Sequence, residues 1–264
     1  MNPIFDGLIV SYLDDVEKYA RNTSTANVIR HAVSNAFYEA GNRIKFQGFG
    51  NSNYRSREMG EALKMLEKAM LIYLLYPSSS VKPPLAPNTK KSPKLQVLDT
   101  GMLNYFGGFQ KGLFGTKDID SVYQGKIAEH IVGQELLARQ TSPLYKPHFW
   151  SREKKQSNAE IDFLIQHENL IVPVEVKSGA AGRLRSLHQF MDRAPHPYAV
   201  RLYSGPLETN RIKTLNGKEF TLLNLPFYLA GSIPEYFEWM ISRQKNSMTL
   251  EYQGQHLIKR SNNN

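Results

Sequence analysis

The sequence contains no cysteine, which excludes disulfide bridges and thiolate metal sites. Its seven histidines are scattered, without the HxxxH or HxH spacing of many zinc sites. The longest apolar run, residues 69–76, is far too short to span a membrane. The first ten residues, MNPIFDGLIV, carry an acid where a secretory signal has a basic segment. We therefore expect a folded, soluble protein of the reducing cytoplasm, without a membrane partner.

The sequence also lacks the GxxxxGK[ST] motif with which many proteins bind a nucleoside triphosphate. The one glycine-rich candidate, residues 48–53, has no lysine to contact the phosphates. We therefore expect neither ATP binding nor ATPase activity from this chain.

Basic residues outnumber acidic ones, since Lys and Arg total 33 and Asp and Glu total 24. The net charge of +9 favours a polyanionic partner such as DNA, because basic side chains that neutralise phosphates gain affinity through counterion release. A basic protein without such a partner is the alternative. With 264 residues and 41% hydrophobic content, the chain is long and apolar enough for two domains with buried cores.

The N-terminal half shows two amphipathic helices followed by two short strands. Apolar residues recur at helical spacing over 25–41 and again over 55–70. Short apolar runs at 71–76 and 95–98 predict strands, and the loop between them, 77–94, is rich in proline and lysine. Helix, helix, strand, basic loop, strand is the order of a winged helix, and it also fits a plain structural module.

Basic side chains on the second helix and on the loop are the candidates for contact with DNA. They are Arg55, Arg57, Lys64, Lys90, Lys91 and Lys94. Glycines become frequent between residues 101 and 115, so we place the end of this first, winged-helix-like domain at residue 119.

The C-terminal half has the pattern of an α/β domain, which we assign to residues 120–245, before a polar tail at 246–264. Its first six elements are predicted in the order helix, three strands, helix, strand. They occupy residues 121–140, 144–151, 160–167, 170–177, 183–192 and 197–203. A further strand at 220–225 and an aromatic-rich helix at 236–241 follow.

Alternation in the strand at 160–167 displays one carboxylate by itself. Asp162 is expected on one side of the sheet, because alternate residues face opposite sides and its apolar neighbours share the other. Those neighbours are Ile161, Phe163 and Ile165. Glu160 shares the face of Asp162, either as an outer metal ligand or as a solvated edge acid, and we favour the solvated edge acid.

The strand at 170–177 places an acid and a lysine on one face. Its apolar face consists of Val172, Val174 and Val176. Glu175 and Lys177 are therefore expected to point together to the other side. If the two strands form a hairpin around residues 167–169, Asp162 and Glu175 come close enough to hold one divalent cation.

These side chains suit phosphodiester cleavage. Carboxylates hold Mg²⁺ or Mn²⁺, the cation neutralises the scissile phosphate and acidifies a water, and an adjacent ammonium orients that water. In the preceding helix, Glu129 shares a stripe with Val132 and Leu136, which turns it toward the sheet. Glu135 is a competitor for the same role. The alternative is an exposed Glu–Lys pair on a strand, beside an unrelated aspartate.

Four segments resemble, in order, the PD-(D/E)XK-like domain that closes a family of prokaryotic AAA-type ATPases. They are GKIAEHIVGQELL, AEIDFLI, LIVPVEVKSG and LRSLHQFM. Three upstream segments resemble the winged-helix linker and hinge of the same proteins, and one downstream segment resembles their closing segment. They are YLDDVEKYA, YRSREMGEALKMLEKAMLIYLLYP and LQVLDTGMLNYF, followed downstream by LPFYLAG.

This resemblance implies a helical, winged-helix-like domain followed by a restriction-endonuclease-like mixed sheet flanked by helices. It makes Asp162 and Glu175 metal ligands for Mg²⁺ or Mn²⁺. It makes Lys177 the catalytic lysine and Glu129 the helix acid. Members of that family begin with an ATPase core, which is absent here, so the chain is either a fragment or a stand-alone protein that acts with a separate ATPase subunit.

Two functions from different classes remain open at this point. The first is a DNA-binding protein whose nuclease-like domain hydrolyses phosphodiesters with a divalent cation. The second is a catalytically inactive nucleic-acid-binding or regulatory module that has kept the nuclease fold.

Overall fold

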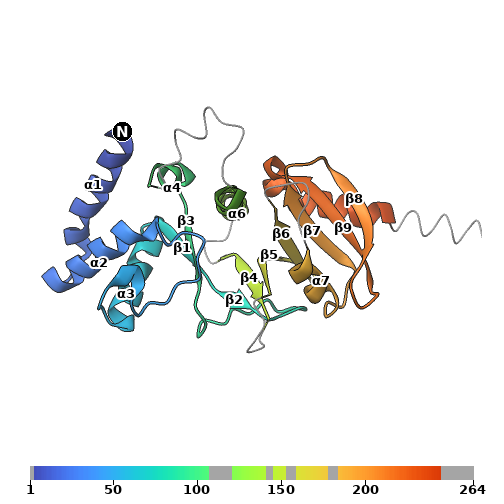
Figure 1. Cartoon of the computed structure of the whole chain (residues 1–264), viewed down its shortest axis with the longest axis horizontal. Coiled ribbons are helices and arrows are strands. Elements are labelled where there is room, and N and C mark those ends of the chain that lie inside the picture. Colours follow the sequence, from blue (N-terminus) through green and yellow to red (C-terminus); the bar gives the residue numbers. More distant parts are fainter. Residues whose placement is uncertain (1–2, 107–120, 141–144, 153–158, 178–183, 245–264) are drawn as a thin grey trace, which may run out of the picture.

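A computed structural model places a helical N-terminal region beside a large mixed sheet (Figure 1). It describes residues 3–106, 121–140, 145–152, 159–177 and 184–244. The predicted α/β class is confirmed. The predicted domain boundary at residue 119 and the polar tail at 246–264 lie outside the described residues. None of the helices in the described part of the chain has the length and apolarity needed to cross a membrane.

The N-terminal region consists of helices and one pair of strands around a shared apolar core. The two predicted helices and the two predicted strands are present, and two further α-helices and a 3₁₀ turn, η1, accompany them. The elements are α1 (Pro3–Tyr19), α2 (Thr23–Ala36), η1 (Phe49–Asn51), α3 (Ser56–Lys68), β1 (Ile72–Leu75), β3 (Lys94–Val97) and α4 (Thr100–Phe106). β1 and β3 pair antiparallel.

Local hydrogen bonds explain where the helices of this region begin and end. The side chain of Asn22 caps α2 by accepting from the Thr25 N–H at 2.8 Å. α2 ends at Ala36 rather than at residue 41, because the chain then turns toward β3. Gly41 takes a φ of 77°, which favours glycine, and its N–H donates to the Leu95 carbonyl oxygen at 2.8 Å.

A seven-stranded sheet forms the larger part of the fold, with the strand order β2-β4-β5-β6-β7-β9-β8. β4, β5 and β6 form an antiparallel meander, β6, β7 and β9 run parallel, and β8 is an antiparallel edge strand. The strands are β2 (Pro77–Ser78), β4 (His148–Ser151), β5 (Glu160–His167), β6 (Leu170–Val176), β7 (Tyr198–Tyr203), β8 (Glu208–Lys213) and β9 (Glu219–Pro226).

Helices cover both faces of this sheet. α6 (Ser121–Ala138), the 3₁₀ turn η2 (Phe227–Ser232) and the helix at 233–244 share an apolar core with one face. α7 (Arg185–Met191) packs on the other face. The order α6, β4, β5, β6, α7, β7 confirms the predicted series of helix, three strands, helix and strand.

The loop between β1 and β3 is attached to the large sheet. It contains β2, which runs parallel to β4 with Pro77 opposite Phe149. Farther along the loop, the Leu85 N–H donates to Gln166 Oε1 of β5 at 3.2 Å. Figure 1 shows this loop reaching from the N-terminal helices to the sheet. The predicted basic loop is therefore attached to the large sheet.

Candidate active site

β5 contains an irregularity at the point where Asp162 lies. His148 of β4 pairs with Leu164, whereas Trp150 pairs with Ile161, so two steps along β4 match three along β5. This is a β-bulge, in which one strand carries an extra residue and the alternation of its side chains is interrupted. Bulges are frequent next to active sites because they re-aim a side chain.

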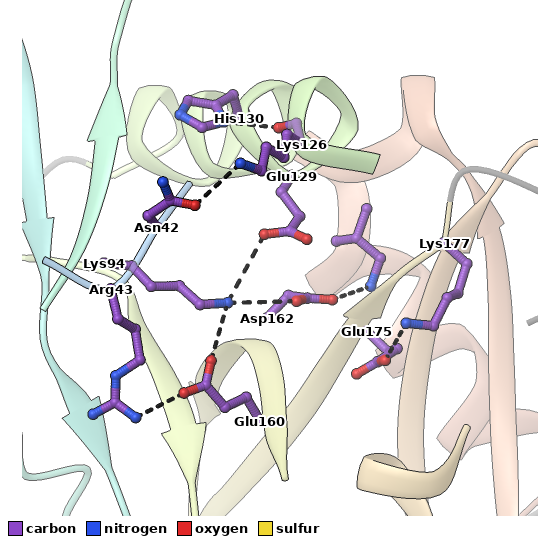
Figure 2. Close-up of polar contacts among 11 residues, drawn as sticks. Asn42, Arg43, Lys94, Lys126, Glu129, His130, Glu160, Asp162, Glu175 and Lys177 are labelled. Carbon is purple, nitrogen blue, oxygen red and sulfur yellow. Dashed lines mark hydrogen bonds and ion pairs between the residues drawn. The ribbon is translucent and has the colours of Figure 1, made fainter. Parts of the chain in front are cut away.

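The bulge changes which residues share a face with Asp162. Phe163 and Ile165 pack beneath α6, but Ile161 packs on the opposite side of the sheet with α7. The predicted common face of these three residues is therefore wrong for Ile161. The Asp162 carboxylate turns toward β6, where its Oδ2 accepts from the Val176 N–H at 2.8 Å (Figure 2).

The predicted hairpin between β5 and β6 is confirmed. His167 pairs with Leu170 across a two-residue turn, and Phe163 pairs with Val174. Glu168 in the turn has a φ of 50°, as tight hairpin turns require. The hairpin carries Asp162 to the end of β6, next to Glu175 and Lys177.

Glu175 and Lys177 extend from the same side of β6, as predicted. Lys177 Nζ lies 2.5 Å from Glu175 Oε1. Glu175 is 4% exposed, and its Oε2 is buried without a hydrogen-bond partner among the described residues. Burial raises the pKa of Glu175 to about 8, and the charge of Asp162 adds to the rise against the opposing effect of Lys177. The site therefore contains a buried carboxyl group with one unused acceptor.

A third carboxylate comes from α6, which lies over this end of the hairpin. Glu129 points from the helix toward Asp162 (Figure 2). Burial raises its pKa to about 7, and the charge of Asp162 adds to the rise, while Lys94 lowers it. Its competitor Glu135 is exposed and lies near Gly231. Glu129 rather than Glu135 therefore faces the candidate site.

The side chain of Lys94, from β3 of the N-terminal region, enters this group of acids. Its Nζ lies 3.7 Å from Asp162 Oδ1, 3.7 Å from Glu160 Oε2 and 3.9 Å from Glu129 Oε2 (Figure 2). The Lys94 side chain is only 13% exposed. The prediction that Lys94 contacts nucleic acid from an exposed loop does not fit this placement, because three carboxylates surround its ammonium.

Glu160 is paired rather than solvated. Its Oε1 accepts from Arg43 Nη1 at 2.8 Å, and its Oε2 faces Lys94. The Glu160 side chain is 24% exposed. The expectation of a solvated edge acid is therefore wrong, because two basic side chains of the N-terminal region reach this edge of the sheet.

The other basic candidates lie on the surface. Arg55 at the N-cap of α3, Arg57 and Lys64 within α3, and Lys90 and Lys91 in the loop before β3 are all exposed. Arg57 forms a surface ion pair with Glu61 at 3.1 Å. These side chains are accessible to a phosphate backbone, and their contact with nucleic acid stays a prediction.

The acids have the donor chemistry of a Mg²⁺ or Mn²⁺ site, since both cations prefer hard oxygen ligands. Among the described residues, no group of three or more His, Cys, Asp or Glu side chains is arranged to hold a metal ion. Two carboxylates, with water and phosphate oxygens in the other positions, are a common way to bind Mg²⁺. Asp162 and Glu175 supply two such carboxylates, and Glu175 Oε2 is an oxygen ligand that no hydrogen bond occupies among the described residues.

Comparisons with known families give two matches. Residues 124–227 match a domain of unknown function, DUF4143. That domain is commonly associated with AAA-ATPase-like proteins, and the matched segment includes every acid of the candidate site as well as Lys177. Residues 5–112 match a second domain of unknown function, DUF8612. No curated protein matches the chain.

Sequence reasoning did not find the participation of Lys94 and Arg43 in this site. Arg43 follows α2, and Lys94 is the first residue of β3. Both come from the N-terminal region and meet the acids only through its docking on the large sheet. No local pattern of hydrophobicity or charge carries that information.

Proposed function

We propose that this chain binds nucleic acid and that its large sheet carries a site for metal-dependent phosphodiester hydrolysis. The observation that carries the proposal is the buried, unpartnered Oε2 of Glu175 between Asp162 and Lys177. An acceptor left unused in a buried position is costly unless a ligand satisfies it. The mixed sheet flanked by helices agrees with the restriction-endonuclease-like fold that the sequence resemblance implies.

Each side chain of the site has a role in this proposal. Asp162 and Glu175 would hold Mg²⁺ or Mn²⁺, which when bound neutralises a phosphate and acidifies a water. Lys177 is 30% exposed, so its ammonium is able to donate to the attacking water or to a phosphate oxygen. Glu129, with a pKa of about 7, is suited to accept or release a proton near neutral pH.

The basic surface supports binding to a polyanion. The chain has a net charge of +9, and several of its basic side chains are exposed. We assign phosphate contacts to five exposed side chains: Arg55 at the N-cap of α3, Arg57 and Lys64 within α3, and Lys90 and Lys91. Contacts of this kind bind DNA with little sequence preference.

A second function is favoured by one specific observation. The ammonium of Lys94 stands among Glu129, Glu160 and Asp162, so the acids already have a cation beside them. A nucleic-acid-binding module that no longer cleaves would be stable with such an internal ion cluster. In this second proposal the sheet only supports the fold, and the protein binds nucleic acid without cleaving it.

We further propose that the chain works beside a separate ATPase. The match of residues 124–227 to a domain that is commonly associated with AAA-ATPase-like proteins supports this partner. The absence of ATP binding by the chain itself stays a prediction, based on the missing phosphate-binding motif.

Cleavage of supercoiled plasmid and labelled single-stranded DNA in Mn²⁺ tests the proposed hydrolysis. Lys177→Met should lower the cleavage rate by about 100-fold or more and keep the rise in melting temperature that Mn²⁺ causes. Glu175→Gln should lose both the cleavage and the rise. Lys213→Met, an exposed lysine on the edge strand β8, is the matched control and should behave like the wild type.

Two results separate the proposed functions. Cleavage that depends on Lys177 supports the nuclease. DNA binding without cleavage, and without any effect of Mn²⁺ on the melting temperature even when DNA is present, supports the non-cleaving module instead.

A further inference from the structure

Lys94 reaches the acids from a different part of the fold. It begins β3, in the N-terminal region, whereas Glu160 and Asp162 lie on β5 and Glu129 on α6 (Figure 2). The Nζ of Lys94 lies over the ring of Phe149, 5.2 Å from the ring centroid. Phe149 itself is fully buried. The ammonium therefore lies near a buried aromatic ring as well as the acids.

The geometry around Nζ is that of a shared cation rather than of a simple ion pair. The three carboxylate oxygens lie at 3.7, 3.7 and 3.9 Å. Charge-assisted hydrogen bonds between ammonium and carboxylate are about 2.7–2.9 Å long, so none of the three contacts reaches that length. Lys94 balances the charge of all three acids without satisfying the hydrogen-bonding capacity of any one.

Lys94 stays charged in this position. Burial lowers its pKa, but the surrounding carboxylates, Asp162 first and Glu129 and Glu160 after it, raise the pKa above its ordinary value. An uncharged amine would leave three negative side chains close together with less compensation, which is unfavourable in a partly buried site.

Several polar contacts hold the N-terminal region against α6 and β5 near Lys94. Arg43 pairs with Glu160, and Lys126 Nζ of α6 donates to Asn42 Oδ1 at 3.0 Å. Gln96 Nε2, two residues after Lys94, donates to the His130 carbonyl oxygen at 3.0 Å. The N-terminal region therefore docks on α6 and β5 around the point where Lys94 enters.

We propose that Lys94 is a tethered cation that competes with Mg²⁺ or Mn²⁺ for the acid cluster, so that docking of the N-terminal region controls metal loading of the site. This inference rests on the proposed function, because it concerns the same site. Asp162 is the shared element: it faces Lys94 through Oδ1 and belongs to the pair that would hold the metal. A divalent cation at Asp162 and an ammonium a few ångströms away repel each other.

Loading therefore requires Lys94 to withdraw, and anything that loosens the docked surface favours the metal-bound state. Nucleic acid bound to the exposed basic face of the N-terminal region is the ligand that we expect to loosen it. Population shifts of this kind follow from differential affinity for the docked and undocked arrangements.

Mn²⁺ affinity of the full chain, measured by isothermal titration calorimetry with and without a short DNA duplex, tests the inference. Lys94→Met removes the charge and keeps an apolar side chain against Phe149. Its Mn²⁺ affinity should exceed that of the wild type by about tenfold or more. Lys82→Met, an exposed lysine in the preceding loop, removes the same charge away from the acids and should leave Mn²⁺ affinity unchanged.

The melting temperature gives a second readout on the same variants. Without metal, Lys94→Met should melt below the wild type, because three acids lose their cation. Millimolar Mn²⁺ should restore most of that loss, and it should raise the wild type by a smaller amount.

The outcomes distinguish the inference from the proposed function on which it rests. Equal Mn²⁺ affinity of the wild type and Lys94→Met overturns the competition and leaves the metal site in place. Failure of both to bind Mn²⁺, even with DNA, overturns the competition and the metal-dependent function together. Tighter binding by Lys94→Met supports both.

Amine acetylation of the wild type, read by mass spectrometry, keeps the inference testable if Lys94→Met does not fold. Lys94 should react at least about tenfold more slowly than Lys82 without metal, and Mn²⁺ with DNA should reduce that protection. Labelling of Lys94 as fast as Lys82, or protection that Mn²⁺ and DNA leave unchanged, overturns the proposal.

Discussion

Lowering the pH from about 7.5 to about 5 is expected to remove a stabilising contribution of His130 to the folded chain. This side chain is 2% exposed, where α6 meets the N-terminal region. Its Nδ1–H donates to the Lys126 carbonyl oxygen at 2.7 Å, and its Nε2 is buried without a partner among the described residues. Burial lowers the pKa of His130 to about 4, and the charges of Lys126 and Lys94 act in the same direction.

The size of the effect follows from the difference between the pKa of His130 in the unfolded chain and its pKa in the folded chain. The unfolded chain protonates this imidazole near pH 6.5, whereas the folded chain resists protonation until about pH 4. Between these two pKa values the unfolded state binds more protons. The contribution of His130 to the free energy of unfolding is therefore complete above pH 6.5 and falls as the pH decreases. The slope is about 1.4 kcal/mol per pH unit, which gives a loss of about 2 kcal/mol at pH 5.

Urea unfolding over this pH range, on the wild type and His130→Gln, measures the effect. Glu129 and Glu175 have raised pKa values and give the opposite trend, so the comparison between the two proteins isolates His130. The stability of the wild type relative to His130→Gln should fall by about 2 kcal/mol from about pH 7.5 to about pH 5.

A control at the same junction tests whether titration is the cause. Gln96→Met removes the hydrogen bond to the His130 carbonyl without removing a titratable group, so its destabilisation should not depend on pH. If the difference between the wild type and His130→Gln is equally independent of pH, the imidazole titrates alike in both states and the reasoning is refuted.

Three further predictions concern packing, the acids and DNA. A Cβ on Gly133 would overlap the amide of Gln96, so Gly133→Ala should lower the free energy of unfolding despite a gain in helix propensity of about 1 kcal/mol. Adding Gln96→Ala should restore part of that loss in urea unfolding, and no recovery would show that the clash is elsewhere. The pKa of Glu175 is raised from 4.5 to about 8, so its contribution to stability is lost as the pH rises toward 8. Glu175→Gln should therefore melt above the metal-free wild type near pH 8, and an unchanged melting temperature would contradict the raised pKa. Lys90→Ala combined with Lys91→Ala should reduce the slope of log affinity against log salt by about two, as measured by fluorescence anisotropy with duplex DNA. An unchanged slope would show that the loop does not contact phosphates.

The strands that carry the candidate site could be predicted from local sequence. β5 begins and ends at the predicted residues, and β6 ends one residue earlier than predicted. Alternation of the valines in β6 fixed the common direction of Glu175 and Lys177, because a regular strand has a period of two. Such inference works where one buried face imposes the pattern.

Inference from local sequence fails where the alternation of a strand is interrupted or where segments distant in the sequence meet. The bulge at Asp162 moves Ile161 to the core on the α7 side of the sheet, and no residue type in this strand indicates a bulge. Lys94 looks like part of a basic loop in the sequence, yet its neighbours in space lie far along the chain. β8 was missed because nearly all of its side chains are exposed, so it has no hydrophobic alternation.

The two-residue strand β2 makes the halves of this protein structurally interdependent. It protects the outer edge of β4, although it belongs to the segment that precedes the predicted boundary. A fragment that starts at residue 120 would expose the backbone amides and carbonyls of that edge, and unpaired edges recruit other chains into aggregates or exchanged dimers. The separate matches at 5–112 and 124–227 therefore do not mark a safe place to cut the chain, and biochemical dissection should retain residues 77–78 with the sheet that they complete.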